Sequence, residues 1–311
     1  MTGRLIQMSG VVVDLVYQVA DVPLAGHEAE VRSATLATGG GFNAMVAARR
    51  AGLEVEFAGT IGTGPMADMV GESLTLEGIA HIGARLSDKD QGICTVLVDN
   101  SGERTFIGCP GADGVITDTD LSNLRSGADD WVLLSGYALS YADSTAALTR
   151  WVQNGGAGAR LVFDPGPRVA TIAPETLSAV LEAALWISAN ASEALVLTGL
   201  SDPAEAARAL SAARPETGGA IVRVGAQGAW LSQGGEPARH IAGHAVQAID
   251  TNGAGDAHIG YFISMLAAGF APTQALRTAN VAAALSTTKE GPSTAPSLNQ
   301  VNAVLALASD L

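Results

Sequence analysis

The feature that most constrains the fold is a repeated alternation of short apolar runs with amphipathic stretches. Two of the runs, "DWVLLSG" (130–136) and "ARLVFDPG" (159–166), are apolar at consecutive positions, which is typical of strands buried on both faces. Each is followed by a segment with helical spacing, "DSTAALTRWVQN" and "PETLSAVLEAA", and "LWISAN" and "GAIVRVG" continue the series. Alternation of this length predicts an α/β fold, a doubly wound and mostly parallel sheet with helices on both faces.

The first and last parts of the chain fit the same pattern. We expect "RLIQMSGVVVDLVYQV" (4–19) to form one long strand, "FNAMVAARRAG" (42–52) a helix, and "EVEFAGTIG" (54–62) a further strand. A helix should begin at Pro65 and end near Gly78, because proline favours the first turn and glycine the end of a helix. Helical periodicity then dominates the last third, and the predicted helices there span about 256–269, 273–287 and 298–309.

Two segments, 12–36 and 92–109, break the alternation because they contain strand patterns with no helix between them. The pattern of residues 92–109 predicts a hairpin that turns at 100–102. Together these segments are expected to form a small β lid that covers a substrate and excludes water. The remaining segments, 1–11, 37–91 and 110–311, should make up the α/β core with the nucleotide and catalytic site.

Composition excludes several classes of partner. The chain has 311 residues, 48% of them hydrophobic, and a formal net charge of −14. Such a surface repels phosphate backbones, so we expect no nucleic-acid partner. No apolar run of 18 residues occurs and the start lacks a signal-peptide layout, which predicts a cytoplasmic protein without a membrane partner. Cys94 and Cys109 provide neither a disulfide framework nor zinc-ligand spacing.

The stretch "AIDTNGAGDAHIGYF" (248–262) combines turn residues with the start of an apolar helical pattern. A helix that opens here would direct its first amides outward as an anion site, and Gly253 and Gly255 would let a ligand approach the backbone closely. Asp256 places a carboxylate at the same point. One interpretation is a simple turn capped by Asp250 or Thr251. The other is phosphoryl transfer, in which the amides hold developing charge and Asp256 accepts a proton from the attacking hydroxyl.

"DTNGAGDAHIGYF" resembles the C-terminal signature of the ribokinase-like (PfkB) family of carbohydrate and nucleoside kinases, and "TGGGFNAMVAARRAG" resembles its N-terminal signature. The resemblance implies an ATP-dependent kinase acting on a small sugar or sugar acid, with Asp256 as general base. It makes "SGVVVD" the first-strand pattern that ends in a sugar-binding aspartate, Asp14, although an ordinary lid-strand aspartate is the alternative. The implied catalytic residues are Asp256, Gly253, Ala254 and Gly255, and the implied substrate-binding residues are Asp14, Gly40, Gly41 and Asn43, with Gly39 beside them.

Two further segments follow in the family's order. "NASE" resembles the family motif in which Asn190 and Glu193 position Mg²⁺, usually through water, although a capping box at a helix start explains the same residues. "VRVGAQGAW" resembles the strand–turn–strand that borders ATP. The resemblance thus implies a nucleotide side made of Asn190, Glu193, Arg223, Gly225, Gly228 and Asn280. A monovalent cation such as K⁺ is an open alternative at Asp250, Asn252 and 287–293.

The sequence also departs from the family pattern, at His258, Thr38 and Gly64. These departures leave the substrate open more than the reaction. A phosphosugar would require a cluster of basic residues, and Arg104 is the main candidate on the lid. The sequence therefore favours an unphosphorylated hexose, pentose or sugar acid, with nucleosides as the alternative because Tyr17, Phe42 and Phe106 could stack on a base. Exposed sheet edges in the lid would allow a homodimer.

Two other classes of protein share single features with this sequence. Gly62-x-Gly64-x-x-Ala67 follows a strand and opens a helix, as in a dinucleotide-binding dehydrogenase, but no acid closes a second strand about twenty residues later. A non-catalytic sugar-binding protein would keep Asp14 and Asn43 but would have no use for Asp256. No Walker-type phosphate loop occurs in the sequence.

Overall fold

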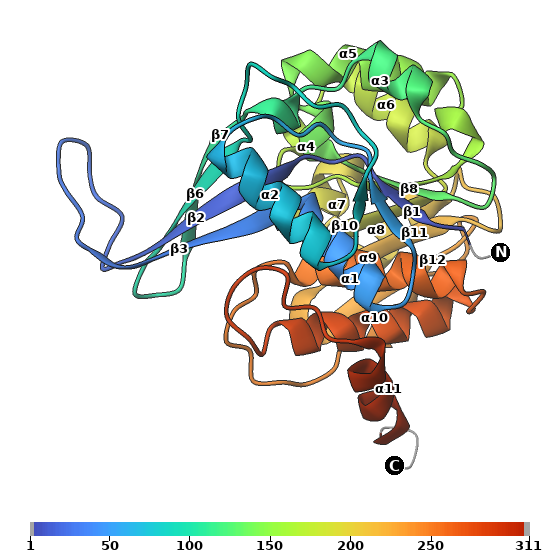
Figure 1. The fold of residues 1–311 in the computed structure, drawn as a ribbon. Helices are drawn as coiled ribbons and strands as arrows, with labels where there is room; N and C mark the ends of the chain where they lie inside the picture. Colours follow the sequence, from blue (N-terminus) through green and yellow to red (C-terminus); the bar gives the residue numbers. More distant parts are fainter. Residues whose placement is uncertain (1–2, 308–311) are drawn as a thin grey trace.

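A large central sheet dominates the computed structural model, which describes residues 3–307 (Figure 1). Within those residues it has nine strands in the order β13-β12-β11-β10-β9-β8-β1-β4-β5. Strands from β11 to β5 run parallel, and β12 and β13 are antiparallel additions at one edge. The strands are β1 (Leu5–Gln7), β4 (Val55–Phe57), β5 (Ala80–His81), β8 (Trp131–Ser135), β9 (Arg160–Asp164), β10 (Trp186–Asn190), β11 (Gly219–Arg223), β12 (Gly228–Ser232) and β13 (Arg239–Ala242).

Successive side chains of the inner strands enter two separate cores, one on each face of the sheet. Trp131 and Leu133 of β8 pack into the core with α1, α2, α9 and α10, whereas Val132 and Leu134 pack into the core on the opposite face, with α4 to α8. This is why the run is apolar at every position. The doubly wound, mostly parallel fold predicted from the sequence is confirmed. The helices are α1 (Gly41–Arg50), α2 (Pro65–Leu76), α3 (Asp118–Asn123), α4 (Gly136–Leu139), α5 (Ala142–Gln153), α6 (Pro174–Ala183), α7 (Ala191–Thr198), α8 (Pro203–Ser211), α9 (Ala254–Ala267), α10 (Pro272–Ser286) and α11 (Leu298–Leu307).

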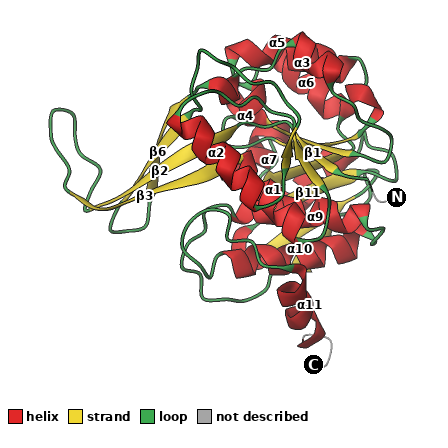
Figure 2. Cartoon of the chain, in the orientation of Figure 1, coloured by secondary structure: helices red, strands yellow, loops and turns green. Residues whose placement is uncertain are grey.

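A smaller four-stranded sheet projects from one side of the molecule (Figure 2). Its order is β3-β2-β6-β7, formed by β2 (Val11–Val19), β3 (Val31–Gly40), β6 (Ile93–Val98) and β7 (Arg104–Cys109). The predicted hairpin is confirmed, because β6 pairs antiparallel with β7 and Gly102 in the turn has a φ of 83°. Strand β3 continues to Gly40, so the smaller sheet ends four residues later than the predicted boundary at residue 36.

The prediction of one long strand over residues 4–19 is wrong. The apolar run forms two strands, β1 in the large sheet and β2 in the smaller one, separated by Met8–Gly10. Ser9 uses its hydroxyl to accept a hydrogen bond from Ser135 N at 2.9 Å, and the carbonyl of Gly10 accepts one from Gly41 N at 3.0 Å. These bonds turn the chain out of the large sheet. A Cβ at Gly10 would lie only 3.1 Å from Asp113, so this crossing has little room for a side chain.

The smaller sheet returns to the core through Gly40, which is both the last residue of β3 and the N-cap of α1. Its φ of 63° lies in the left-handed region that favours glycine, and a Cβ there would lie 2.8 Å from the carbonyl oxygen of Gly10. The close approach of two chain segments therefore requires glycine at this position.

The three predicted C-terminal helices are confirmed as α9, α10 and α11, with starts that differ from the prediction by two residues or fewer. The last two residues of the predicted helix 298–309 lie outside the described part of the chain. Across residues 3–307, no helix combines the length and apolar character needed to cross a membrane.

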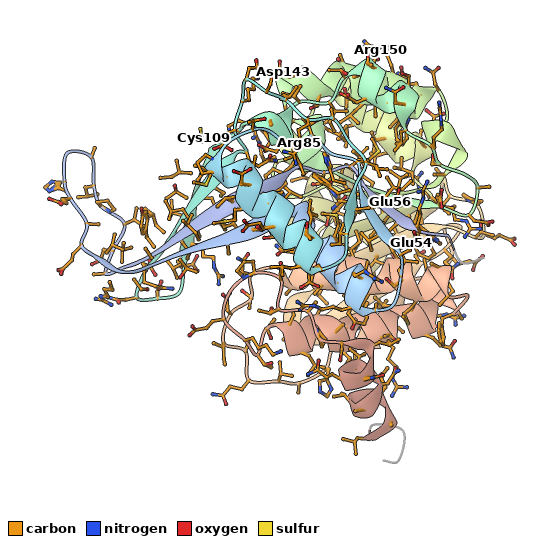
Figure 3. The ribbon with its side chains drawn as sticks, in the orientation of Figure 1. Glu54, Glu56, Arg85, Cys109, Asp143 and Arg150 are labelled. Atoms are coloured by element: carbon orange, nitrogen blue, oxygen red, sulfur yellow. The ribbon has the colours of Figure 1, made fainter. Side chains whose placement is uncertain are left out.

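Acidic side chains lie on the outside of the large layer. Glu54 and Asp143, labelled in Figure 3, are exposed, whereas Glu56 is half-buried and pairs with Arg4. Cys109 is an exposed free thiol at the end of β7, and Cys94 is half-buried. The excess negative charge of the sequence is therefore carried in part by solvated side chains.

Candidate active site

Three neighbouring parallel strands end in charged or polar side chains that converge at one edge of the sheet. Asp164, Asn190 and Arg223 are the last residues of β9, β10 and β11. The Arg223 guanidinium lies 3.7 Å from Oδ2 of Asp164 and 3.6 Å from Oε2 of Glu193, and it donates to Ser188 Oγ at 2.8 Å. In open α/β sheets this carboxyl edge is where ligands bind.

The Arg223 cluster contains two carboxylates for one cation. Burial and the charge of Asp164 raise the pKa of Glu193, and the neighbouring Arg223 opposes them. A site with excess buried negative charge is suited to an additional cation. The sequence analysis did not select Asp164, although an acid that ends a buried strand in "LVFDPG" was a visible signal.

Asn190 and Glu193 form the capping box that was the alternative interpretation of "NASE". Oδ1 of Asn190 accepts a bond from Glu193 N, and Oε2 of Glu193 accepts one from Asn190 N, each at 2.8 Å. A third bond of 2.8 Å joins Asn190 Nδ2 to Oε1 of Glu193. Residues 3–307 contain no group of three or more His, Cys, Asp or Glu side chains that could hold a metal ion directly. The paired acids Asp164 and Glu193 nevertheless fit hydrated Mg²⁺, which retains several waters and needs few carboxylates.

Helix α9 begins without a side-chain cap. Gly253 is its N-cap residue, in the left-handed conformation with φ 72° and ψ 4°. The predicted alternative, a cap from Asp250 or Thr251, is not what the structure shows, because the Asp250 side chain bonds to Asn252 N and Gly291 N instead. The first amides of α9 therefore form a potential anion site, in which the Ala254 amide also donates to the carbonyl oxygen of Thr251 at 3.3 Å.

Asp256 lies in the first turn of α9, and Asn43 of α1 holds its carboxylate. Asn43 Nδ2 donates to Oδ2 of Asp256 at 3.3 Å, while Oδ1 of Asn43 accepts bonds from Ser293 N at 2.9 Å and Ser293 Oγ at 2.8 Å. These two acceptor bonds fix which way the amide points. Burial, reinforced by the charge of Asp164, raises the pKa of Asp256 to about 7.

Ser293 was not selected by the sequence analysis. It is the one non-glycine residue with positive φ, 56°, in the described part of the chain. Arg50 stabilises this conformation by donating to the carbonyl oxygens of Ser293 at 2.9 Å and Ala295 at 2.8 Å. A left-handed non-glycine residue costs of order 1–3 kcal/mol and is most often found at functional sites.

Asp14 of β2 lies in electrostatic reach of Asp256, since its charge contributes to the raised pKa of that residue. The Asp14 side chain packs over Gly39, where a Cβ would lie 2.0 Å from Oδ2. Burial raises the pKa of Asp14 to about 6. At Gly41 a Cβ would lie 2.8 Å from Gln7 Nε2, so this glycine has a packing role whether or not it contacts a substrate.

The predicted nucleotide-side residues differ in their surroundings. A Cβ at Gly225 would meet no atom within 4 Å, whereas one at Gly228 would lie 2.2 Å from the carbonyl oxygen of Ile241. Of these two glycines, only Gly225 thus faces open space. Asn280 donates to the carbonyl oxygens of Ile241 and Ala242 at 3.0 Å each, so its amide group joins α10 to β13.

His258 lies within 3.1 Å of Oδ1 of Asn280 through Nε2. Because the Asn280 amide donates to β13, its Oδ1 is the acceptor and His258 Nε2 carries the proton. Burial lowers the pKa of His258 to about 3, so the ring is neutral at physiological pH. His258 is therefore a buried, neutral residue that packs between α9 and α10 in this structure.

The two segments considered for a monovalent cation lie side by side. Ile249 N and Asp250 N both donate to the carbonyl oxygen of Thr287, at 2.7 and 3.1 Å, and Gly291 N donates to Oδ2 of Asp250 at 3.0 Å. The carboxylate also forms an ion pair with Arg104 of β7, which the sequence analysis did not predict.

The dehydrogenase interpretation of Gly62-x-Gly64-x-x-Ala67 is not supported. The Asp90 side chain occupies the start of α2, where it accepts bonds from Met66 N at 3.2 Å and Ala67 N at 2.8 Å. A Cβ at Gly64 would lie 2.5 Å from that carboxylate. A protein acid therefore takes the place where a pyrophosphate would have to bind.

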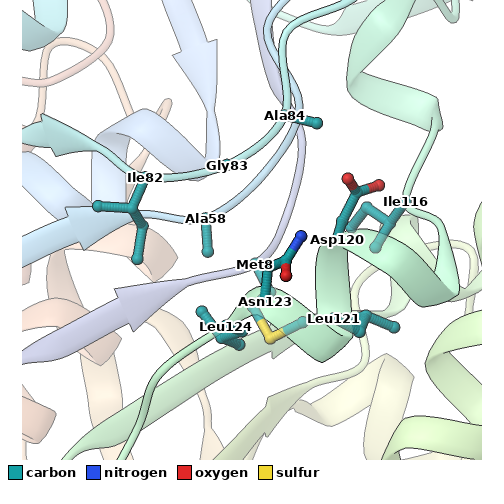
Figure 4. A pocket seen from close by; sticks show the side chains of 10 residues that line it. All are labelled: Met8, Ala58, Ile82, Gly83, Ala84, Ile116, Asp120, Leu121, Asn123 and Leu124. Carbon is teal, nitrogen blue, oxygen red and sulfur yellow. The ribbon is translucent and has the colours of Figure 1, made fainter.

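A separate cavity of about 140 Å³ lies between α3 and the ends of β1, β4 and β5 (Figure 4). Its lining includes Met8, Ala58, Ile82 and Leu121, with Asp120 and Asn123 as polar members. None of the predicted site residues lines it. It is also smaller than the few hundred Å³ typical of pockets for drug-sized ligands.

An uncapped helix N-terminus beside a buried carboxylate is the arrangement expected of an α/β phosphotransferase, because it can hold charge on a phosphoryl group next to a base. The chain belongs to the pfkB family of carbohydrate kinases, whose model matches residues 8–299.

The comparisons include sugar and nucleoside kinases. Ribokinase of Haemophilus influenzae is 30% identical over 263 residues, which cover 81% of this chain and 81% of the relative. Ribokinase of Giardia lamblia shares the fold with a TM-score of 0.85 at 22% identity, covering 99% of this chain and 100% of that one. Aminoimidazole riboside kinase of Salmonella enterica, in complex with aminoimidazole riboside and an ATP analogue, has a TM-score of 0.79 at 25% identity and covers 97% of this chain and 100% of its own. The protein is thus an ATP-dependent kinase of this family.

Proposed function

We propose that the protein transfers the γ-phosphoryl group of ATP to a hydroxyl of an unphosphorylated sugar or sugar acid. The observation that carries this proposal is Asp256, a carboxylate with a pKa raised to about 7 in the first turn of an uncapped helix. A general base works best when its pKa lies near the operating pH. The Asn43 amide orients this base and keeps it beside the anion site.

In the proposed reaction the substrate hydroxyl gives its proton to Asp256 as its oxygen attacks the phosphorus. The amides of 253–256, including those of Ala254 and Gly255, stabilise the charge on the transferring group. Arg223 supports the same region, because its Cζ lies 3.7 Å from the position of a Cβ on Gly255. A single donor in such a site contributes about 2.7–4 kcal/mol of transition-state stabilisation.

The substrate side of the site would consist of Asp14, Gly40, Gly41 and Asn43. Asp14 comes from the smaller sheet, which we propose acts as a lid over the substrate. A buried carboxylate can accept bonds from two sugar hydroxyls. Arg104, the basic residue considered for a phosphosugar, is already paired with Asp250, and this supports an unphosphorylated substrate.

The nucleotide side would consist of Asn190, Glu193, Arg223, Gly225, Gly228 and Asn280. Asn190 and Glu193 would hold Mg²⁺ through water, and the ion would neutralise charge on the phosphates of ATP. Asn280 and Gly228 are proposed only to lie near the nucleotide, because both already pack against β13.

A nucleoside remains the second candidate substrate. Tyr137 is 42% exposed, so its ring is available to stack on a base; partial burial and the charges of Cys94 and Asp256 raise its pKa to about 12. Phe42, in contrast, is buried in the core and cannot stack on a ligand. A screen of sugars, sugar acids and nucleosides by ADP release distinguishes the candidates, and turnover of nucleosides alone would contradict the sugar preference.

The test of the mechanism is Asp256→Asn, which keeps the shape of the side chain and removes the base. We expect the rate of ADP release to fall by about 10²–10⁴-fold while sugar affinity, measured by calorimetry, changes little. Wild-type turnover in this variant would remove Asp256 from the mechanism. Sugar binding without turnover in the wild type would instead favour the non-catalytic sugar-binding protein.

Assembly and location stay predictions. The smaller sheet has two edge strands, and Leu36, Phe106 and Ile107 on them are exposed. Open edges with apolar side chains favour pairing with a second copy, so we propose a homodimer through this sheet, to be tested by sedimentation equilibrium. A cytoplasmic location is proposed on the sequence pattern alone.

A further inference from the structure

The family resemblance places a monovalent cation beside Asp250, but the hydrogen bonds of this carboxylate do not fit that arrangement. Oδ1 accepts a bond from Asn252 N at 2.8 Å and pairs with Arg104, and Oδ2 accepts a bond from Gly291 N at 3.0 Å. Both oxygens are therefore already engaged. Arg104 Nη1 also donates to Thr251 Oγ1 at 3.3 Å, so the guanidinium spans two consecutive residues of the loop.

We infer that Arg104 supplies, from the smaller sheet, the single positive charge that a monovalent cation would otherwise supply at Asp250. This inference rests on the proposed kinase function. It makes Arg104 a positioning residue, and phosphoryl transfer by this protein should then be independent of K⁺.

The charge and burial of the Arg104–Asp250 pair support the inference that Arg104 takes the place of the cation. The side chains of Arg104 and Asp250 are 23% and 18% exposed, so their attraction is screened less than that of a surface pair. Guanidinium and K⁺ carry the same charge, and a K⁺ ion bound to Asp250 would lie beside the guanidinium. Two like charges at this separation repel, so the ion would have to displace Arg104.

The pair is connected to the catalytic residues through two loops. Asp250 leads to Gly253, the N-cap of α9, and its carboxylate joins this loop to the segment around Gly291. Ser293, two residues further, holds Asn43, and Asn43 holds Asp256. A positive charge paired with Asp250 thus fixes two parts of the site. One is the start of α9, where the anion site lies, and the other is the loop that supports Asp256 through Asn43.

The position of Arg104 has a further consequence. Arg104 is the first residue of β7 in the smaller sheet, whereas Asp250 belongs to the loop before α9. The positive charge therefore reaches Asp250 only when the smaller sheet lies against this loop. The proposed lid would then complete the anion site as it closes over the substrate.

The experiment compares Arg104→Met, which removes the charge, with Arg104→Lys, which keeps it. Arg32→Met is the matched control, because Arg32 lies in the same sheet and donates to Asn100 rather than to Asp250. ADP release is measured in KCl and in choline chloride at equal ionic strength. For wild type, Arg104→Lys and Arg32→Met, the rates of each protein in the two salts should agree within about twofold. Arg104→Met should lose at least about tenfold in choline and regain activity in KCl.

A second measurement does not need turnover. The melting temperature of the ligand-free protein is compared in KCl, LiCl and choline chloride. We expect no K⁺-specific rise in the wild type and a clear one in Arg104→Met, because a ligand that binds only the folded state raises its stability. A K⁺-specific rise or a severalfold K⁺ activation in the wild type would overturn the inference, as would Arg104→Met that is insensitive to K⁺ in both assays.

The two proposals can fail separately. If no sugar, sugar acid or nucleoside releases ADP with the wild type, the proposed function fails, yet the melting experiment still tests the charge at Asp250. If Arg104→Met does not fold, K⁺ activation of the wild type or of Arg104→Lys remains the result that contradicts the inference, and K⁺ independence of both supports it.

Discussion

At the scale of single residues, the site is organised around the proton affinity of one carboxylate. Burial and the negative charge of Asp164 raise the pKa of Asp256 to about 7, whereas the bond from Asn43 and the charge of Arg223 oppose that rise. The surroundings thus bring an ordinary aspartate into the range where a base is half-charged near neutral pH.

This balance predicts a pH profile. The base must be ionised to accept a proton, so kcat in the wild type should rise with pH through about 7 and level off above it. Asn43→Ala removes a bond that favours the ionised form, so it should move the midpoint to higher pH and lower the plateau. Rates of ADP release across pH, with saturating substrates, measure both effects. A midpoint that stays in place or moves down in Asn43→Ala would contradict this account.

Sequence patterns predicted those candidate site residues that lie in short motifs. Asp14, Asn43 and Asp256 were predicted from three separate segments, and the structure brings them into one region. Ser293 and the pairing of Arg104 with Asp250 could not be predicted, because each depends on contacts between residues more than 140 positions apart. No local pattern encodes such contacts.

At the scale of helices and strands, a buried arginine joins two helix ends. Arg214 donates to the carbonyl oxygens of Glu182 at 3.3 Å and Ala184 at 2.7 Å at the end of α6, and to Leu210 of α8 at 3.4 Å. Carbonyl oxygens at a helix end lack partners within the helix, and a cation there also interacts favourably with the helix dipole. Burial lowers the pKa of Arg214, but these acceptors keep the charge compensated.

We therefore expect Arg214→Ala to lower the free energy of unfolding by about 2–3 kcal/mol, because buried carbonyl groups lose their donors. Urea denaturation followed by circular dichroism measures the change. Arg208→Ala is the matched control on α8, since Arg208 forms an exposed pair with Glu205 and should matter by less than about 1 kcal/mol. Equal losses in the two variants would show that the buried bonds are not the cause.

The fold shows where periodicity is informative and where it is not. The sequence located closely those strands whose side chains alternate between the two cores, such as β8. It also located closely the helices of ten or more residues. The division of residues 4–19 between two sheets was missed, because the run is apolar on both sides of Met8–Gly10. The break is encoded by the contacts of Ser9 with Ser135 and of Gly10 with Gly41, which exist only after the sheets have formed.

At the scale of the whole molecule, the site should lower stability as pH rises. Asp14 and Asp256 have pKa values of about 6 and about 7 in the folded protein, above the ordinary value of 3.8. Groups with raised pKa values contribute stability that is complete below the unfolded value and is lost as pH rises through the folded one. The ligand-free melting temperature should therefore fall between about pH 4 and pH 7.

The double variant Asp14→Asn, Asp256→Asn should show a flatter dependence, and at about pH 8 it should melt about 2–4 °C above the wild type. Asp21→Asn, in an exposed position, serves as control and should follow the wild type. Differential scanning fluorimetry across pH provides the measurement. A parallel decline in the double variant would assign the loss of stability to other groups.

Asp14 stands on a strand of the smaller sheet and Asp256 on a helix of the larger layer. A molecule with several hydroxyls offers a separate group to each carboxylate, whereas a water molecule offers only one oxygen. We therefore expect ATP to be consumed slowly when no acceptor is present, because a lone water lacks the contacts that would hold it in line with the phosphorus. Placing the two acids on different parts of the protein should therefore limit idle hydrolysis of ATP.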